Sequence, residues 1–253
     1  MAKAFDKAHY SSEKKAVIEL IKADLRSSGG FIADGVICPE IFERQEDRIL
    51  CILAESYGYD NCEMKDIEDQ GESDLLGLDN HSVKTPRRLG VLLHLLQRSF
   101  ETRAQISPDE WKGFPWLLSP RKESADVLQT VFSKIAWINV KKASKGNGTR
   151  LSSAECREHA FRNKEILRRQ IASTAPTLIL IGGEIVFSSL YELGVLGTEV
   201  SLGRKWELQG RDHEPQVIEM THPGWLKWRS YDYIYDRYNC IYAQMTRGVK
   251  VVR

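Results

Sequence analysis

Three side chains that could do chemistry stand at the ends of short apolar runs in this sequence. Glu55 follows the run at residues 49–54, and Asn139 and His222 close or follow similar runs further along the chain. Each has an ordinary structural explanation when taken alone, because a glutamate can cap a helix, an asparagine can close a turn and a histidine can be a hydrogen-bonded core residue. A carboxylate, an amide and an imidazole brought together could instead read a polar ligand and move a proton.

The apolar runs that carry these residues are expected to be strands. Short runs bounded by turn residues are typical of strands buried on both faces, and here they alternate with segments of helical periodicity. Strands are expected at residues 49–54, 135–140, 177–181 and 216–220, and helices at 13–26, 84–103, 152–171, 184–193 and 231–245. Right-handed crossovers then predict an α/β fold, a three-layer αβα sandwich with a central, mainly parallel four-stranded sheet. The three side chains would meet at the carboxyl edge of that sheet, where ligands bind in such folds.

The composition is that of an ordinary globular domain. The chain has 253 residues and a net charge of only +1, so any attraction for nucleic acid must come from local basic patches. We expect a monomeric single domain over residues 1–253 with an N-terminal helical extension at 1–45. The five cysteines form no C-x-x-C pair, which predicts a cytoplasmic protein with reduced thiols, and neither a metal nor a cofactor is expected. No run resembles a signal sequence or reaches transmembrane length, so no membrane association is expected.

A basic segment and a turn-rich aromatic segment supply further candidate contacts. Residues 141–150 contain lysines, an arginine and glycines but no acidic residue, and such a loop could bind phosphate through charge and backbone N–H groups. The segment lacks the nucleotide-binding P-loop pattern, and a merely solvated loop is its plain alternative. Phe114 and Trp116 could stack on a planar ligand or could simply cover the core.

Four segments resemble, in order, the motifs of the uracil-DNA glycosylase superfamily. Residues 54–58 (AESYG) resemble the motif that follows the first core strand, and residues 136–140 (AWINV) resemble the asparagine-bearing strand. The strand before Gly182-Gly183 resembles the third core strand, and residues 222–226 (HPGWL) resemble the final His-Pro motif with its DNA-inserting loop. Each motif is short, so the resemblance depends on their order and their positions at strand ends over residues 48–242.

The resemblance implies a DNA partner whose pyrimidine nucleotide is flipped out of the duplex into a pocket. Asn139 would read the edge of the base, and His222 would donate to the base O2, where negative charge develops as the glycosidic bond breaks. Glu55, or otherwise Asp60, would supply the carboxylate that stabilises the sugar cation and orients water.

Other residues would line the base or hold the DNA by the same resemblance. Trp225 and Leu226 would fill the vacated base stack. The base pocket would include Ser56, Tyr57, Gly58 and Trp116. The phosphate contacts would be Lys141, Lys142, Lys145, Lys227 and Arg229.

The sequence departs from the family pattern at several motif positions. Ser56 stands where some members have the water-activating aspartate, Ala54 replaces a glycine and Gly224 replaces a serine. Gly58 stands where uracil-specific members place a tyrosine against the C5 edge of the base. The missing ring would leave room for a substituent at C5, so a 5-substituted or otherwise enlarged pyrimidine is the expected substrate.

The expected activity is that of a monofunctional DNA glycosylase that leaves an abasic site. No lysine occupies the motif positions, so Schiff-base lyase chemistry has little support. One biological setting would be defence against phages whose DNA carries hypermodified cytosine, including glucosylated hydroxymethylcytosine.

Three alternatives remain open from the sequence. The protein could be an ordinary uracil-repair glycosylase, or a non-catalytic DNA-binding module of the same fold, which Ser56 would permit. A small-molecule hydrolase of the α/β type is the third, but the chain lacks the G-x-S-x-G nucleophile elbow around Ser56.

Overall fold

The protein is built around a mixed sheet whose strand order is β1-β3-β2-β4-β5. The computed structural model describes residues 4–24, 34–54, 84–119, 121–142, 151–196, 215–224 and 226–247. The strands are β1 (Gly35–Val36), β2 (Ile49–Leu53), β3 (Ile135–Asn139), β4 (Leu178–Gly182) and β5 (Gln216–Met220). Strands β2 to β5 run parallel to one another, and β1 pairs antiparallel with β3 at one edge.

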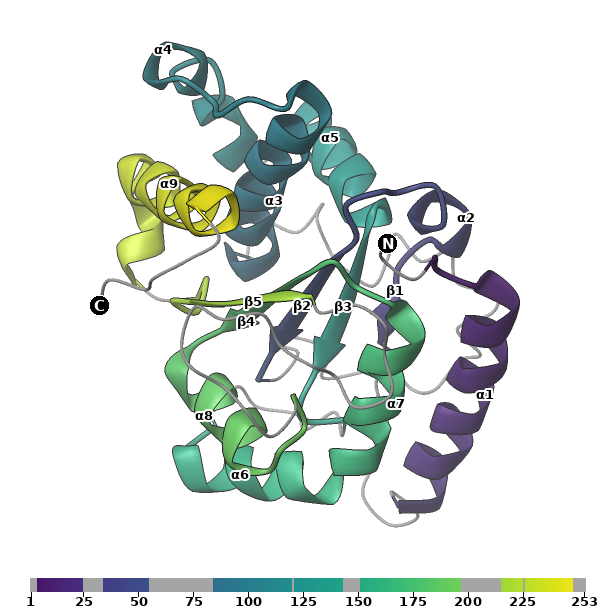
Figure 1. Cartoon of the computed structure of the whole chain (residues 1–253). Helices are drawn as coiled ribbons and strands as arrows, with labels where there is room; N and C mark the ends of the chain where they lie inside the picture. The colour runs from purple at the N-terminus through teal and green to yellow at the C-terminus, as the bar shows by residue number, and fades with distance from the viewer. Residues whose placement is uncertain are drawn as a thin grey trace.

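Helices cover both faces of the sheet. In Figure 1, α3 (Lys84–Thr102), α5 (Lys122–Ser133) and α9 (Tyr231–Arg247) lie on one face. The other face carries α6 (Ser153–Arg162), α7 (Lys164–Thr174) and α8 (Glu184–Glu192), with α1 (Lys7–Asp24) packed outside α7. The short helices are α2 (Pro39–Phe42), α4 (Pro108–Trp111), η2 (Pro115–Leu118) and η3 (Leu226–Arg229). Among the described helices, none has the length and apolar character that crossing a membrane requires.

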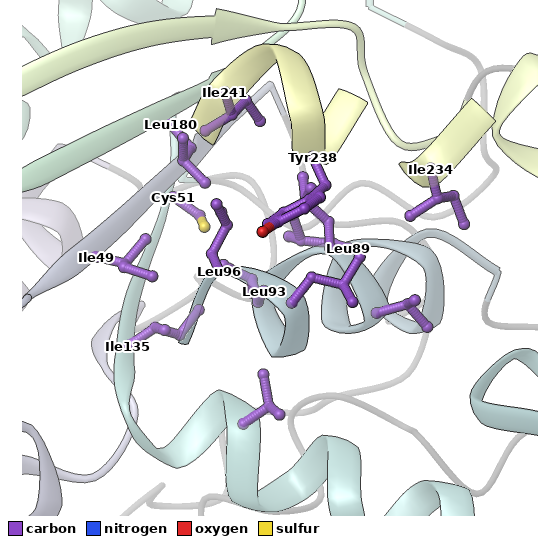
Figure 2. Close-up of a cluster of buried hydrophobic side chains, with 14 of the residues drawn as sticks. Ile49, Cys51, Leu89, Leu93, Leu96, Ile135, Leu180, Ile234, Tyr238 and Ile241 are labelled. Carbon is purple, nitrogen blue, oxygen red and sulfur yellow. The ribbon is translucent and has the colours of Figure 1, made fainter. Parts of the chain in front are cut away.

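Strand β2 divides the apolar core in two. All of its residues are buried, and successive side chains point to opposite faces of the sheet. Ile49, Cys51 and Leu53 belong to the cluster under α3, α5 and α9, whereas Leu50 and Ile52 belong to the cluster under α6, α7 and α8. Figure 2 shows part of the first cluster, in which Ile49 and Cys51 lie near side chains from α3 and α9.

The predicted α/β class and the parallel strands are confirmed, but the predicted number of strands is wrong. The sheet has five strands instead of four, and the fifth, β1, pairs antiparallel with β3, so the sheet is mixed. Strand β1 has only two residues and therefore no apolar run to reveal it. Its position depends on a contact with α1, because the backbone N–H of Val36 donates to the Tyr10 hydroxyl at 2.6 Å. The predicted helical extension at 1–45 therefore includes a strand of the sheet.

Two helical predictions also need correction. Helix α5 was not predicted, although Ala125, Leu128 and Phe132 follow helical spacing and are buried. The single helix expected at 152–171 is two helices separated at Asn163. The side chain of Asn163 donates from Nδ2 to the Val140 carbonyl at 2.9 Å, which ties the break to the end of β3.

We predict that stability falls as the pH drops below the usual histidine pKa of about 6.5. Burial lowers the pKa of His94, helped by Arg98, and burial also lowers the pKa of His159, helped by Lys141. The unfolded chain therefore binds more protons than the folded chain just below that pH, and protonation favours unfolding. Urea denaturation at pH 7.5, 6.5 and 5.5 should show the loss, and His94→Gln should make the dependence shallower.

Glu13→Gln is the matched control for this prediction. The side-chain hydrogen bond from Arg169 lowers the pKa of Glu13 below its model-compound value of 4.5, so this carboxylate stays ionised throughout the tested range. The variant should keep the wild-type pH dependence between 7.5 and 5.5. A His94→Gln protein with an unchanged dependence would contradict the assignment.

Candidate active site at the carboxyl edge of the sheet

The structure brings Asn139 and His222 to the same edge of the sheet. Asn139 ends β3 and pairs in register with Leu53 of β2, and Gly182 at the end of β4 pairs with Met220 of β5. His222 follows β5 directly. Strands β2 and β4 lie between the two residues, so ordinary strand spacing separates their backbones by about 14 Å. Two side chains and a ligand the size of one ring can span such a gap.

The loop after β5 fixes one protonation form of His222. The backbone N–H of Gly224 donates to His222 Nδ1 at 3.0 Å, so Nδ1 acts as an acceptor. In a neutral imidazole the proton then resides on Nε2, which is buried. A neutral histidine with its N–H at Nε2 is the form that can donate a hydrogen bond to a developing oxyanion.

Close packing explains why a glycine follows His222-Pro223. A Cβ added at Gly224 would lie 2.9 Å from His222 Nδ1 and 3.1 Å from Thr85 Oγ1. Any side chain at this position would therefore disturb the His222 ring. Arg88 of α3 holds the same loop, since its Nη1 donates to the Pro223 carbonyl at 3.2 Å.

Two arginines lie near the start of α3, and the second of them, Arg88, contacts this loop. Arg87 and Arg88 lie in the first turns of α3 and are both buried, and burial lowers the pKa of each. The nearby positive charge of Arg229 lowers the pKa of Arg88 further. Arginine stays protonated in proteins despite such shifts, so the groups can attract an anionic ligand. Sequence patterns did not single out Arg87 and Arg88, although this basic pair stands near the start of a long predicted helix.

Asn139 is buried and held in a defined orientation. Its backbone N–H donates to Asp34 Oδ2 at 2.5 Å, and its side-chain Oδ1 accepts from Trp137 Nε1 at 3.2 Å. Trp137 packs against the cluster under α3, α5 and α9, and Asn139 shares its face because strand side chains alternate. The amide therefore lies on the side of the sheet that also carries Arg88.

The two lysines that follow Asn139 are not surface residues. The Lys142 ammonium pairs with Asp34 at 2.7 Å, and the two side chains are only 2% and 5% exposed. The phosphate contact predicted for Lys142 does not fit this position, because the ammonium would have to leave a buried ion pair. Lys141 is also buried, and its backbone N–H donates to the Ala54 carbonyl at 3.0 Å.

Lys227 and Arg229 lie in η3 and are exposed, whereas the intervening Trp228 is fully buried. The buried tryptophan anchors η3, so its two basic neighbours face solvent next to the His222 loop. Their predicted phosphate contacts suit this geometry and stay predictions. The backbone of Leu226 begins the same helix.

The aromatic candidates lie elsewhere or are only partly exposed. The Phe114 ring packs edge-on against His94 at 5.2 Å and lies under the Arg98 guanidinium at 5.7 Å. These residues are about two and three helical turns from Arg88 along α3. The structure therefore does not bring Phe114 to Asn139 or His222. Trp116, in η2, is 38% exposed.

Seven of the predicted site residues lie outside the described residues, so their roles stay predictions. They are Glu55, Ser56, Tyr57, Gly58, Asp60, Lys145 and Trp225.

Comparison of the sequence with protein-family models and with curated proteins gives no significant match. Within the described ranges, no group of three or more His, Cys, Asp or Glu side chains is placed to hold a metal ion.

We predict that Gly224→Ala displaces the His222 ring. The new methyl group would overlap His222 Nδ1 and weaken the hydrogen bond from the backbone N–H of residue 224. Nitrogen chemical shifts of the imidazole should report Nε2–H in the wild type and a changed tautomer mixture in the variant. Gly113→Ala is the control, because a Cβ there is also tight, 3.2 Å from the Glu110 carbonyl, but far along the chain from the loop. An unchanged His222 spectrum in Gly224→Ala would refute the prediction.

Proposed function

We propose that the protein is a monofunctional DNA glycosylase that removes a flipped pyrimidine and leaves an abasic site. One observation carries the proposal: an oriented Asn139 amide and the His222 imidazole, whose Nδ1 accepts from the backbone N–H of Gly224, lie at the same carboxyl edge of the sheet. The resemblance of the surrounding motifs gives this pairing its chemical meaning, since an amide can read a base edge and an imidazole can stabilise a leaving base.

In the proposed reaction the bond between C1′ and the base nitrogen breaks, and the base leaves with the bonding electrons. Negative charge spreads to the base O2, where the Nε2–H of His222 donates. A water oxygen bonds to C1′ and gives up its proton to a carboxylate, for which Glu55 is the preferred candidate. Asn139 selects the base by hydrogen bonds to its polar edge.

Basic groups beside the His222 loop support the choice of DNA as the partner. Arg88 lies under the loop, and Lys227 and Arg229 are exposed on the next helix. These groups would hold phosphates on either side of the flipped nucleotide. Because the whole chain has a net charge of only +1, this attraction would be local, and binding should weaken as salt increases.

Within this function, the preferred substrate is an enlarged or 5-substituted pyrimidine. The preference derives from Gly58 and the departures from the family motifs, not from the described residues. Removal of glucosylated hydroxymethylcytosine from phage DNA would be one use of such an enzyme. An ordinary uracil-repair activity and a non-catalytic DNA-binding role are the alternatives that the experiment must separate.

We predict abasic sites in DNA that contains an enlarged pyrimidine. The protein is incubated with phage DNA carrying glucosylated hydroxymethylcytosine, with uracil-containing DNA and with unmodified DNA, and alkali then cleaves any abasic sites. His222→Gln and Asn139→Asp should each lower the rate by about 10²–10³-fold, the usual cost of losing a donor to a developing oxyanion or the group that orients the substrate. His94→Gln, a histidine change on the α3–Phe114 contact, should keep the wild-type rate.

Each other outcome selects a different function. Strand breaks only in uracil-containing DNA would identify an ordinary uracil glycosylase. Salt-dependent binding that His222→Gln leaves unchanged, with no abasic product from any DNA, would identify a non-catalytic binding module. The absence of both binding and breaks would overturn the proposal.

A further inference from the structure

A buried carboxylate outside the proposed reaction holds together the end of β3. Asp34 stands just before β1, and its side chain is 5% exposed. It accepts hydrogen bonds from the backbone N–H of Asn139 at 2.5 Å, from the Lys142 ammonium at 2.7 Å and from Gln170 Nε2 of α7 at 2.8 Å. Donors from β3, from the chain beyond it and from a helix therefore converge on one carboxylate.

This arrangement is an expensive way to stabilise a fold. Removing both charges of an ion pair from water costs free energy that their attraction offsets only when the remaining hydrogen bonds are well made. The desolvation of Lys142 is visible as a lowered pKa, which the nearby Asp34 charge only partly opposes. Apolar residues of similar volume commonly replace such pairs without loss of stability. The buried Asp34–Lys142 pair instead fixes the backbone geometry at the end of β3.

The carboxylate acts where the sheet itself gives no support. Strand β1 pairs with β3 only at Trp137 and Ala136, so Asn139 lies beyond the last paired residue on that side. The Asp34 carboxylate takes over as acceptor for the Asn139 N–H. On the other side, Leu53 of β2 pairs with Asn139, and the Leu53 carbonyl accepts from the backbone N–H of Val140, just after β3, at 2.9 Å. The Asn139 backbone is therefore fixed from both sides.

We infer that Asp34 is a positioning residue for Asn139: its carboxylate fixes the backbone of that residue and thereby the direction of the amide. The link to catalysis rests on the proposed glycosylase function. A group that reads a base must hold its position closely, because a misplacement of about 1 Å can lower a rate about 10²-fold.

Two double variants isolate the hydrogen bond from the buried charge. Asp34→Asn with Lys142→Met and Asp34→Ala with Lys142→Met both remove the ion pair, and they differ in the acceptor offered to Asn139. The amide introduced by Asp34→Asn can be accommodated, since Gln170 Oε1 is buried and has no hydrogen-bond partner among the described residues. That oxygen can turn to accept from the new amide nitrogen.

The expected result is a difference between the two double variants. Asp34→Asn/Lys142→Met should protect the Asn139 amide from hydrogen exchange and keep kcat within about threefold of wild type. Asp34→Ala/Lys142→Met should expose that amide to faster exchange and lower kcat by at least about tenfold with little change in KM, as expected when orientation is lost. Melting temperatures of both variants, measured alongside, show that each is folded.

The control removes a different ion pair from the same helical layer. Glu13 pairs with Arg169 of α7 at 2.8 Å, and neither residue bonds to Asn139. Glu13→Ala with Arg169→Met should leave both kcat and the exchange of the Asn139 amide unchanged.

The outcomes separate this inference from the proposed function. Equal kcat in the two folded Asp34 double variants, with an active wild type, would overturn the inference and leave the glycosylase proposal intact. A wild type that releases no base from any DNA would overturn the glycosylase proposal. Hydrogen exchange would then decide the inference alone, and equal exchange of the Asn139 amide in both variants would overturn it.

Discussion

The whole architecture depends on the burial of β2 on both faces. Its five residues are all buried, and alternate side chains enter the two apolar clusters beneath the two helical layers. This strand runs parallel to β3 and β4, and parallel neighbours need crossover connections, which here pass through helices on the two faces. Parallel strands bring their carboxyl ends to one edge. Asn139 and His222 consequently lie at the same edge, at the end of β3 and just after β5, although 82 residues separate them in the sequence.

The features that sequence patterns predicted well are those that each pattern encodes locally. Strands β2 and β4 are apolar runs buried along their whole length, and α3 repeats leucines at helical spacing, so their positions could be predicted closely. Strand β1 could not be predicted in this way, because a two-residue strand is specified by the Tyr10 hydroxyl and by β3 rather than by its own residues. The split at Asn163 likewise depends on a carbonyl of a distant strand.

In the candidate site, too, some features follow from local sequence patterns and others from contacts between distant residues. That Asn139 and His222 would share an edge followed from strand order, and the structure places them there. The position of Lys142 did not follow, because a run of basic residues does not distinguish a solvated lysine from one that is buried against a carboxylate 108 positions away. The tautomer of His222 also depends on three-dimensional contacts, since it is set by the backbone N–H of Gly224.

The short strand β1 makes the N-terminal residues necessary for the geometry of the Asn139 backbone. Tyr10 of α1 holds β1, β1 places Asp34, and Asp34 receives the backbone N–H of Asn139. A relay of single hydrogen bonds thus leads from the first helix to the edge where the base would be read. Trimming the chain to begin at β2 would keep every parallel strand and every crossover helix, yet it would discard the partner of the Asn139 backbone. The N-terminal residues are in that sense needed to fix the Asn139 backbone and are not a mere addition to the sheet.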